Sequence, residues 1–318
     1  MKAIVREKYG EAAVLELKEI PKPQVAQNEV LIKVLAASLN KADWHLMTGT
    51  PFPLRFSTGI FKPKNIGIGA DFAGMVEQVG SDVKQFKVGD EVYGELPSSS
   101  FGSLAEYVCT IESVLAKKPN GISFEESAAI PLTALTALQG LRNTAQLKEG
   151  MKLLINGASG GVGSYAIQIA KNLGAHVTAV CSTAKLEQAK RLRADEVIDY
   201  TIQDFTTVEK KYDAIFDMIG NHRLRAISKV LKKGGKYACG AAALEVLFKG
   251  WWYKLGKQQS MKIFLAKPNR ADLQTLTKWL EEGSLKAVIE KTYTLDDAPE
   301  AMQKLSNGGL KGKLVIVM

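Results

Sequence analysis

A cluster of glycines between two apolar runs constrains this chain more than any other feature. It lies in the stretch LLINGASGGVGSYAIQIAKNLGAHVTAVC at positions 153–181. Residues 152–156 and 176–181 are apolar runs of strand length, and residues 164–174 between them have helical apolar spacing. A strand, a helix and a second strand in this order form a parallel crossover unit. The chain is therefore expected to contain a parallel sheet covered by helices.

The glycines match the turn of a dinucleotide-binding unit. Ala158, Gly160 and Gly163 form an A-x-G-x-x-G pattern, and Gly157 adds a parallel G-x-x-G-x-x-G pattern. In such a turn a small first residue permits the tight bend, the second lets the backbone approach a pyrophosphate, and the third lets helix and strand pack closely. The phosphates then meet free N–H groups at the positive end of the helix. A purely structural glycine turn is the alternative, and the position between strand and helix favours the dinucleotide.

The end of the second strand indicates which dinucleotide binds. NAD-binding units carry an acidic residue there, which bonds to the ribose hydroxyls. Here Cys181 is followed by Ser182 and Thr183, and Lys185 comes next but one. A hydroxyl and an ammonium group suit a 2′-phosphate, with no carboxylate at the strand end to repel it. NADPH is therefore the predicted cofactor; the alternative is that Lys185 is a solvated surface lysine.

Strand and helix patterns divide the chain into two kinds of fold. Up to about residue 119, short valine-rich runs separated by Gly, Pro and Asp predict a β-rich, barrel-like block. A Ser-x-x-Glu capping box at Ser123 opens a helical pattern that continues to residue 144. After residue 150, strands alternate with helical segments, which predicts a doubly wound parallel sheet. The tail after residue 270 is expected to form helix, strand, helix and strand, and to return to the first block.

Composition excludes several classes of protein. Of the 318 residues, 46% are hydrophobic and 24% charged, as in globular proteins. The net charge of +9 comes from scattered lysines, and the densest group, residues 229–236, fits a helix C-terminus capped by glycine. Nucleic acid is therefore not an expected partner. The three cysteines are too far apart for a disulfide framework, and no apolar run reaches the roughly 20 residues of a membrane helix. Without a secretory signal, a cytoplasmic protein with no transmembrane segment is expected.

Several stretches together resemble the zinc-free quinone oxidoreductase (zeta-crystallin-like) family of medium-chain dehydrogenases/reductases. They are NEVLIKVLAASLNKADWHLMTG, GADFAGMVEQVGSDVKQFKVGDEVYG, GSLAEYV, AAIPLTALTAL, LLINGASGGVGSYAIQIAK, ADEVIDY and GGLKGKLVI. The resemblance covers nearly the whole chain. It implies an α/β protein with a GroES-like catalytic domain at residues 1–122, completed by 268–318, and a Rossmann NADPH-binding domain at 123–267. It also implies a homodimer.

The resemblance also assigns roles to single residues. Asn40 corresponds to an asparagine near the nicotinamide, and Thr136 to a threonine at the start of the helix bordering the cofactor. The remaining cofactor-binding positions that the family pattern implies are Gly160, Gly161 and Val162 for the diphosphate, Ser182, Lys185 and Tyr200 for the 2′-phosphate, and Lys311 and Lys313 for the domain junction.

No metal is expected. Asp71 stands where zinc-dependent relatives carry a pair of catalytic zinc ligands. A closed structural zinc site needs four soft ligands, and this chain has three scattered cysteines. Hydride transfer to an electrophilic acceptor, a quinone or an α,β-unsaturated carbonyl, remains feasible without a Lewis acid. His45 replaces a tyrosine that many quinone reductases carry, and it is the candidate proton donor. Together with Asn40, it is a predicted catalytic residue. The alternative is that His45 is structural.

Two other functions stay open at this point. One is a nucleotide-binding regulator or RNA-binding protein of the zeta-crystallin-like kind, with little catalytic activity. The other depends on residues 244–259, where Trp251, Trp252 and Tyr253 lie among lysines. This segment suits a substrate lid or a dimer contact, or a foot on a membrane surface.

Overall fold

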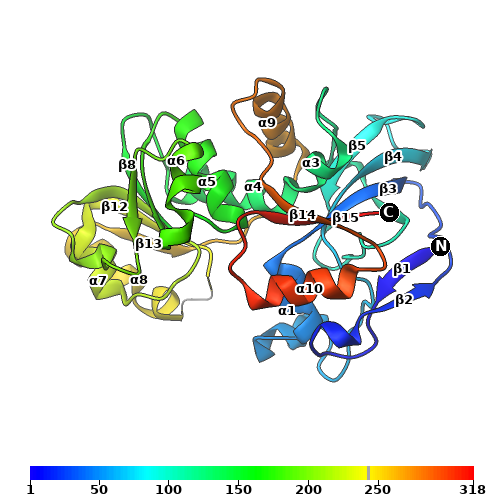
Figure 1. Ribbon diagram of the computed structural model, residues 1–318, viewed down its shortest axis with the longest axis horizontal. Helices are drawn as coiled ribbons and strands as arrows, with labels where there is room; N and C mark the ends of the chain where they lie inside the picture. The colour runs from blue at the N-terminus through cyan, green and yellow to red at the C-terminus, as the bar shows by residue number, and fades with distance from the viewer. Residues whose placement is uncertain (242–243) are drawn as a thin grey trace. The chain divides into compact units, whose positions relative to one another are not determined.

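The structure, a computed structural model, describes residues 1–241 and 244–318. The chain forms two compact units, each built around its own main sheet (Figure 1). Unit 1 comprises Met1–Leu132 and Pro268–Met318, and unit 2 comprises Thr133–Lys267.

Unit 1 contains a seven-stranded sheet with the order β14-β15-β3-β4-β5-β7, in which β6 also pairs with β3. β14 and β15 run parallel, and the other pairs are antiparallel. The strands are β3 (Glu29–Leu39), β4 (Asp71–Val79), β5 (Glu91–Glu95), β6 (Tyr107–Ile111), β7 (Leu115–Lys117), β14 (Ile289–Thr294) and β15 (Lys313–Val317), and β1 (Lys2–Val5) and β2 (Glu16–Glu19) form a separate pair. The tail of the chain therefore supplies two strands to the sheet of the N-terminal block.

Five helices accompany the sheet of unit 1: α1 (Lys41–Thr48), α2 (Arg55–Thr58), α3 (Phe124–Ala128), α9 (Arg270–Glu281) and α10 (Ala298–Asn307). The capping box predicted at Ser123 is present, because its hydroxyl accepts from the Glu126 N–H and the Glu126 carboxylate accepts from the Ser123 N–H. α3 packs on β3 and β4, so it belongs to unit 1.

The helical pattern predicted over residues 123–144 is confirmed, and Pro131 divides it into separate helices. α3 ends at Ala128, α4 (Pro131–Gln139) starts anew, and a π-helical turn follows at Gly140–Thr144. Proline has no N–H to donate and is tolerated at the first position of a helix. The chain passes from unit 1 to unit 2 within α4.

Unit 2 contains a six-stranded sheet with the order β10-β9-β8-β11-β12-β13, and every neighbouring pair is parallel. The strands are β8 (Lys152–Asn156), β9 (His176–Cys181), β10 (Glu196–Asp199), β11 (Tyr212–Asp217), β12 (Leu231–Cys239) and β13 (Ser260–Ile263), and the helices are α5 (Gly161–Asn172), α6 (Leu186–Arg191), α7 (Leu224–Val230) and α8 (Leu244–Lys257). Figure 1 draws α5 and α6 on one side of this sheet and α7 and α8 on the other. β8, β9 and β11 are buried along nearly their whole length, as expected for strands covered on both faces. The predicted doubly wound parallel sheet is confirmed.

The glycine cap predicted for residues 229–236 is wrong. α7 ends at Val230, and Leu231 continues in extended conformation as the first residue of β12. Leu231 pairs with Tyr212 of β11, and the register then shifts so that Lys236 pairs with Ala214. Gly234 has a φ of 77°, but it lies in this irregular stretch of the strand and does not cap the helix. The residues after α7 therefore pair with β11 as a strand, and no glycine cap forms at the end of the helix.

The three cysteines, Cys109, Cys181 and Cys239, are free thiols. Within the described residues, none of the helices has the length and apolar character needed to cross a membrane.

Candidate functional site

The glycine turn, residues 157–163, joins β8 to α5 in unit 2. Gly157 has a φ of 83°, which glycine adopts readily, and its carbonyl accepts from the Gly160 N–H at 3.2 Å. A Cβ on Gly163 would lie 2.1 Å from the Gly157 oxygen and 2.7 Å from the Ala158 Cα, so α5 packs directly on the turn. A Cβ on Gly160, in contrast, would meet only the Gly157 oxygen, at 3.6 Å. Gly157 is therefore favoured by its backbone conformation and Gly163 by close packing, whereas the backbone of Gly160 has open space beside it.

These positions correct one detail of the sequence interpretation. The tight bend is made by Gly157, whereas Ala158 is fully buried and its N–H donates to Val180. The open backbone at Gly160 is followed by the N–H groups of Gly161, Val162 and Gly163, which have no carbonyl within α5 to donate to. A turn that has open space beside the Gly160 backbone, followed by free N–H groups at the start of a helix, fits a diphosphate. The residues present thus fit a dinucleotide.

Three predicted 2′-phosphate residues lie together at the ends of β9 and β10. Cys181, the last residue of β9, is in register with Asp199, the last residue of β10, and the Tyr200 N–H donates to the Cys181 carbonyl at 3.1 Å. Ser182 follows Cys181, and the Lys185 N–H donates to the Ser182 carbonyl at 2.9 Å. Ser182 and Lys185 are half-buried, and Tyr200 is exposed. We refer to Ser182, Lys185, Asp199 and Tyr200 as the strand-end cluster.

Asp199 is a member of this cluster that sequence reasoning missed. Its carboxylate accepts from the Thr183 hydroxyl at 2.5 Å and from the Thr201 N–H at 2.9 Å, and these bonds hold its pKa below the usual range. Burial raises the pKa of the neighbouring Cys181 thiol, with Asp199 adding to the rise and Lys185 opposing it. The strand end therefore carries one cation and one anion. The sequence ADEVIDY could have revealed Asp199, because this aspartate directly precedes Tyr200 at the end of a predicted strand. Parallel strands end at the same edge of a sheet, which brings Asp199 close to the end of β9.

Asn40, Lys313 and Asp71 meet in unit 1, and we call them the buried lysine network. The Asn40 amide donates to Asp71 at 3.0 Å, and its oxygen accepts from the Lys313 ammonium, which also lies 3.3 Å from Asp71. Asp71 further accepts from the Ser38 hydroxyl and from the Leu132 N–H at the start of α4. Lys313 and Asn40 are 3% exposed and Asp71 is fully buried. The network ties the ends of β3, β4 and β15 to α4.

Two more carboxyl groups surround this network, and burial changes their chemistry. Burial and the Asp71 charge raise the pKa of Asp43 to about 7, and the same causes raise that of Glu95 well above its usual range. Burial lowers the pKa of Lys313, while the carboxylates oppose that change. Lys313 is thus a basic side chain among buried acids, and it lies 3.3 Å from Asp71. Its ammonium contacts Asn40 and Asp71 within unit 1, and its predicted role in cofactor binding stays a prediction.

His45 lies in α1, close to the capping box that Asn40 and Asp43 form at the start of this helix. Its Nδ1 lies 2.7 Å from the Thr50 carbonyl oxygen. Because a carbonyl only accepts, Nδ1 carries the proton and Nε2 is the bare nitrogen of the neutral ring. Burial lowers the pKa of His45, and the charge of Lys41 lowers it further. The hydrogen bond to Thr50 raises this pKa but does not offset the other two effects. At neutral pH the ring is therefore mainly uncharged.

Two remaining predicted residues are placed as follows. Thr136 is in the middle of α4 and belongs to unit 2. Thr133, rather than Thr136, lies in the first turn of this helix, and it is 5% exposed. Lys311 is exposed just before β15, and its N–H donates to Glu290 at 2.6 Å. Lys311 and Lys313 are therefore in opposite environments although only one residue separates them.

Comparison with known proteins assigns the family. Residues 26–120 match the alcohol dehydrogenase GroES-like domain, and residues 192–316 match a domain described as zinc-binding dehydrogenase. The chloroplast envelope quinone oxidoreductase homolog of Arabidopsis thaliana is 35% identical, over 96% of this chain and 95% of that protein. The chain belongs to the quinone oxidoreductase branch of the medium-chain dehydrogenase/reductase family. The resemblance inferred from its motifs is confirmed.

Two further relatives agree with this membership. The NADPH-dependent alkenal/one oxidoreductase of Arabidopsis thaliana is 35% identical, over 99% of this chain and 79% of that protein. The quinone oxidoreductase of Coxiella burnetii has a solved structure with a TM-score of 0.89 and 32% identity, covering 100% of this chain and 99% of that one. The predicted fold class, a GroES-like β-rich domain with a Rossmann-type parallel sheet, is confirmed.

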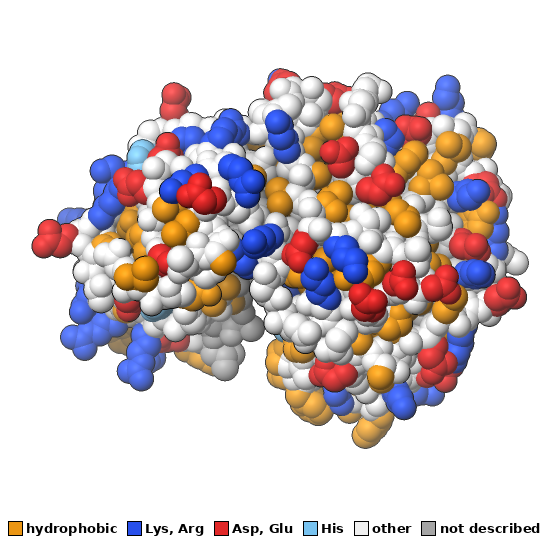
Figure 2. All heavy atoms as spheres, viewed as in Figure 1, with side chains coloured by type: hydrophobic (Ala, Val, Ile, Leu, Met, Phe, Trp, Pro, Cys, Tyr) orange, Lys and Arg blue, Asp and Glu red, His pale blue; other side chains and the backbone are white. Residues whose placement is uncertain are grey.

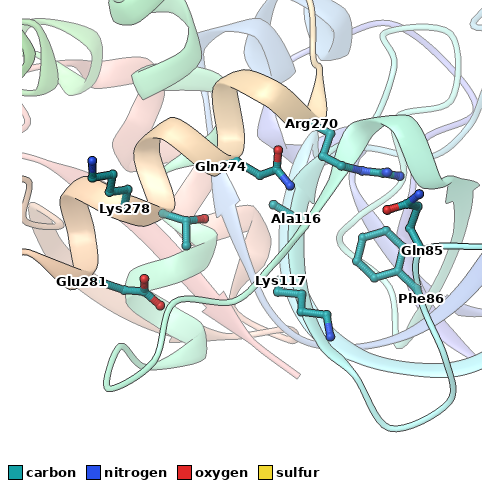
Figure 3. A pocket seen from close by; sticks show the side chains of 9 residues that line it. Gln85, Phe86, Ala116, Lys117, Arg270, Gln274, Lys278 and Glu281 are labelled. Atoms are coloured by element: carbon teal, nitrogen blue, oxygen red, sulfur yellow. The ribbon is translucent and has the colours of Figure 1, made fainter.

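A hollow of about 380 Å³ in unit 1 contains none of the predicted residues. It is lined by Gln85, Phe86, Ala116 and Lys117, and by the α9 residues Arg270, Gln274, Thr277, Lys278 and Glu281 (Figure 3). The Arg270 guanidinium lies over the Phe86 ring at 5.2 Å and donates to the Glu112 carbonyl. This arginine therefore fastens α9 to the sheet, and the hollow is not the candidate site. In the part of the chain that the structure describes, no group of three or more His, Cys, Asp or Glu side chains is placed to hold a metal ion.

Proposed function

We propose that this protein is an NADPH-dependent oxidoreductase that reduces a quinone or an α,β-unsaturated carbonyl without zinc. The observation that carries the proposal is the glycine turn, whose open backbone at Gly160 precedes the free N–H groups of α5. A bound nicotinamide cofactor supplies hydride to such an acceptor. The chain itself binds and orients both molecules. The names of the relatives, quinone and alkenal/one oxidoreductases, support the same acceptor classes.

In this proposal the strand-end cluster selects NADPH over NADH. The Ser182 hydroxyl and the Lys185 ammonium hold the 2′-phosphate, and the exposed Tyr200 ring borders the adenine side. Asp199 is occupied by the Thr183 and Thr201 hydroxyls, so its carboxylate orients this turn instead of accepting from a ribose. The charge of Asp199 opposes the 2′-phosphate, and Lys185 outweighs it by direct contact.

Zinc independence is supported by the buried lysine network. The Lys313 ammonium lies 3.3 Å from Asp71, the residue at the position of a zinc ligand in zinc-dependent relatives. A resident cation already balances this carboxylate, and a second cation beside it would be repelled. Asn40 is held by both of its polar atoms within the network. Its role in the proposal is to hold the start of α1, where it forms the capping box with Asp43.

The proton that completes reduction is proposed to come from water near neutral pH. His45 is neutral there, and its single N–H is donated to the Thr50 carbonyl. Its protonated form, populated at lower pH, is the form that donates a proton from Nε2. His45 thus contributes to turnover in acidic solution and is structural at neutral pH.

The deciding experiment combines the purified protein with NADPH and a panel of quinones, alkenals and enoyl thioesters. The expected result is loss of the nicotinamide absorbance with at least one acceptor, unaffected by a zinc chelator. Saturable NADPH binding with no turnover on any acceptor would instead favour the regulator. Turnover that a chelator abolishes and zinc restores would refute the zinc-free proposal.

The face of the protein shown in Figure 2 does not favour the RNA-binding alternative. On the face shown in Figure 2, Lys and Arg side chains are interspersed with Asp and Glu, without a continuous basic stripe. We further propose a homodimer, as the family resemblance suggests, and a cytoplasmic location, as the three free cysteines suggest. The edge strand β13, with one side of its backbone open to pairing, is a suitable contact. Light scattering of the purified protein measures the oligomeric state directly.

A further inference from the structure

Helix α8, at the periphery of unit 2 in Figure 1, has apolar side chains on two opposite faces. The inner face packs on the core: Val246 is 4% exposed and Tyr253 contacts the cluster that contains Leu224 and Ile227 of α7. Gly250 brings the helix close to β13, because a Cβ there would lie 2.7 Å from the Met261 oxygen. The helix is therefore seated on unit 2 by its inner face alone.

The α8 outer face consists of Leu247, Phe248, Trp251, Trp252 and Leu255. Their exposed fractions are 63, 72, 53, 60 and 71%, respectively. At about 100° per residue, these positions cover one continuous arc of roughly 140°. The two tryptophan rings stack with their centroids 4.2 Å apart. A continuous exposed face of five large apolar side chains is typical of a docking surface.

Charge indicates what this face docks to. Residues 244–267 contain five lysines and a single acid, Glu245, which pairs with Lys249 at 3.5 Å. Lys249 and Lys254 are exposed, and helical spacing places them on the two borders of the outer face. A second copy of this face would bring lysines against lysines. An anionic surface, in contrast, would complement both borders.

We propose that the α8 outer face binds the surface of membranes that contain anionic lipids. The indole rings of Trp251 and Trp252 lie at headgroup level, where aromatic rings with a polar atom are favoured. Phe248 and the two leucines enter the acyl boundary, and Lys249 and Lys254 meet lipid phosphates. With 14 residues, α8 is too short to span a bilayer and lies in its plane. This site is independent of the function proposed above.

The test is cosedimentation of the full-length protein with vesicles of phosphatidylcholine alone or with 30% phosphatidylserine. We expect binding to the anionic vesicles that weakens as salt rises, with a blue shift of tryptophan emission. Trp251→Ser/Trp252→Ser should lower the partition coefficient by about tenfold or more, since two large apolar groups are lost. Lys249→Ser/Lys254→Ser should remove most of the preference for anionic vesicles. Leu265→Ser is the matched control, because Leu265 is 89% exposed in the same unit but lies outside the helix.

Several results would overturn the proposal. The first is no binding to anionic vesicles, and the second is binding that the double tryptophan variant retains. The third is a dimer that this variant dissociates without a change in vesicle binding, which would make the outer face a contact between copies. The fourth is loss of turnover on a water-soluble quinone with vesicle binding intact, which would make α8 a substrate lid. Circular dichroism of each variant separates these outcomes from unfolding.

Discussion

The two polar clusters at strand ends contain similar residues in opposite environments. In unit 2, Ser182, Lys185, Asp199 and Tyr200 surround the ends of β9 and β10, and Tyr200 is 61% exposed. In unit 1, Lys313, Asp71 and Asn40 join the ends of β15, β4 and β3, and none is more than 3% exposed. Each cluster brings a lysine near an aspartate. Only the cluster in unit 2 leaves polar atoms accessible to a ligand.

This difference in exposure, more than residue type, is the reason we propose the unit 2 cluster as a binding site and interpret the unit 1 cluster as a structural network. A buried ion pair has lost its water, so its groups depend on one another and removal of one is costly. Exposed charged groups contribute little to stability, because solvent screens them, and such a group can bind a ligand. The unit 1 cluster should therefore respond to mutation in its stability, and the unit 2 cluster in its affinity for cofactor.

The largest effect is expected from Lys313→Met. This change leaves the buried Asp71 without its cation, which should lower the free energy of unfolding by about 3–5 kcal/mol. Urea denaturation followed by circular dichroism measures it. Lys311→Met, on the exposed lysine nearby, is the control and should leave the unfolding midpoint unchanged.

Adding Asp71→Asn to Lys313→Met should recover part of the lost stability, because no unpaired charge then remains buried. If Lys313→Met left stability intact but weakened NADPH binding, Lys313 would be a cofactor ligand and the contrast between the clusters would fail.

Within unit 2, two alanine substitutions in the glycine turn separate packing from binding. Gly163→Ala forces a Cβ against the Gly157 oxygen at 2.1 Å and should lower stability by about 1–3 kcal/mol. Gly160→Ala meets open space and should keep the unfolding midpoint, but it should weaken NADPH binding because the methyl group occupies the diphosphate position. Thermal unfolding and fluorescence titration measure the two properties. Equal effects of both changes on stability would contradict the separate roles of these glycines.

Lys185→Ala tests cofactor choice in the exposed cluster. It should weaken NADPH binding by about 1–3 kcal/mol, the range for a hydrogen bond to a charged group, and leave NADH binding and stability unchanged. Asp199→Asn should act in the opposite direction and tighten NADPH binding, because a negative charge near the 2′-phosphate is removed. Isothermal titration with both cofactors gives the comparison. Equal loss of NADPH and NADH affinity in Lys185→Ala would remove the assignment.

The smallest effect is expected from His45→Phe. The exposure of His45 is intermediate, between that of the buried cluster in unit 1 and that of the exposed cluster in unit 2. Since burial lowers the pKa of His45, its cationic form disappears as pH rises through a value below the usual 6.5. The loss of enone turnover should therefore be about tenfold in acidic solution and vanish near pH 8, because water replaces the donor. Readily reduced quinones serve as control acceptors and should be affected less. A loss independent of pH would indicate that His45 acts through the structure of α1.

Several features of the fold and site could be predicted from the sequence because they depend on residues that are close together along the chain. The turn at residues 157–163, the capping box at Ser123 and the alternation of strands and helices in unit 2 all belong to this class. Local patterns of this kind reflect backbone conformation and periodic burial, which a single sequence displays. The grouping of Ser182, Lys185 and Tyr200 came from the family pattern, and parallel strands that end at one edge bring these residues together.

Tertiary structure alone decided the environment of each polar side chain. Lys311 and Lys313 are nearly adjacent in sequence, yet one is exposed and the other is buried beside Asp71, 242 residues away. The carboxylate of Asp199 reaches Thr183 only because β10 pairs with β9, and the α8 outer face is open only because the inner face is already packed. The sequence by itself determined the alternating strands and helices of unit 2 and the glycine turn, since these follow from local periodicity. Burial and charge pairing depend on contacts between distant strands, so only the folded chain decided which polar groups remain available to a ligand.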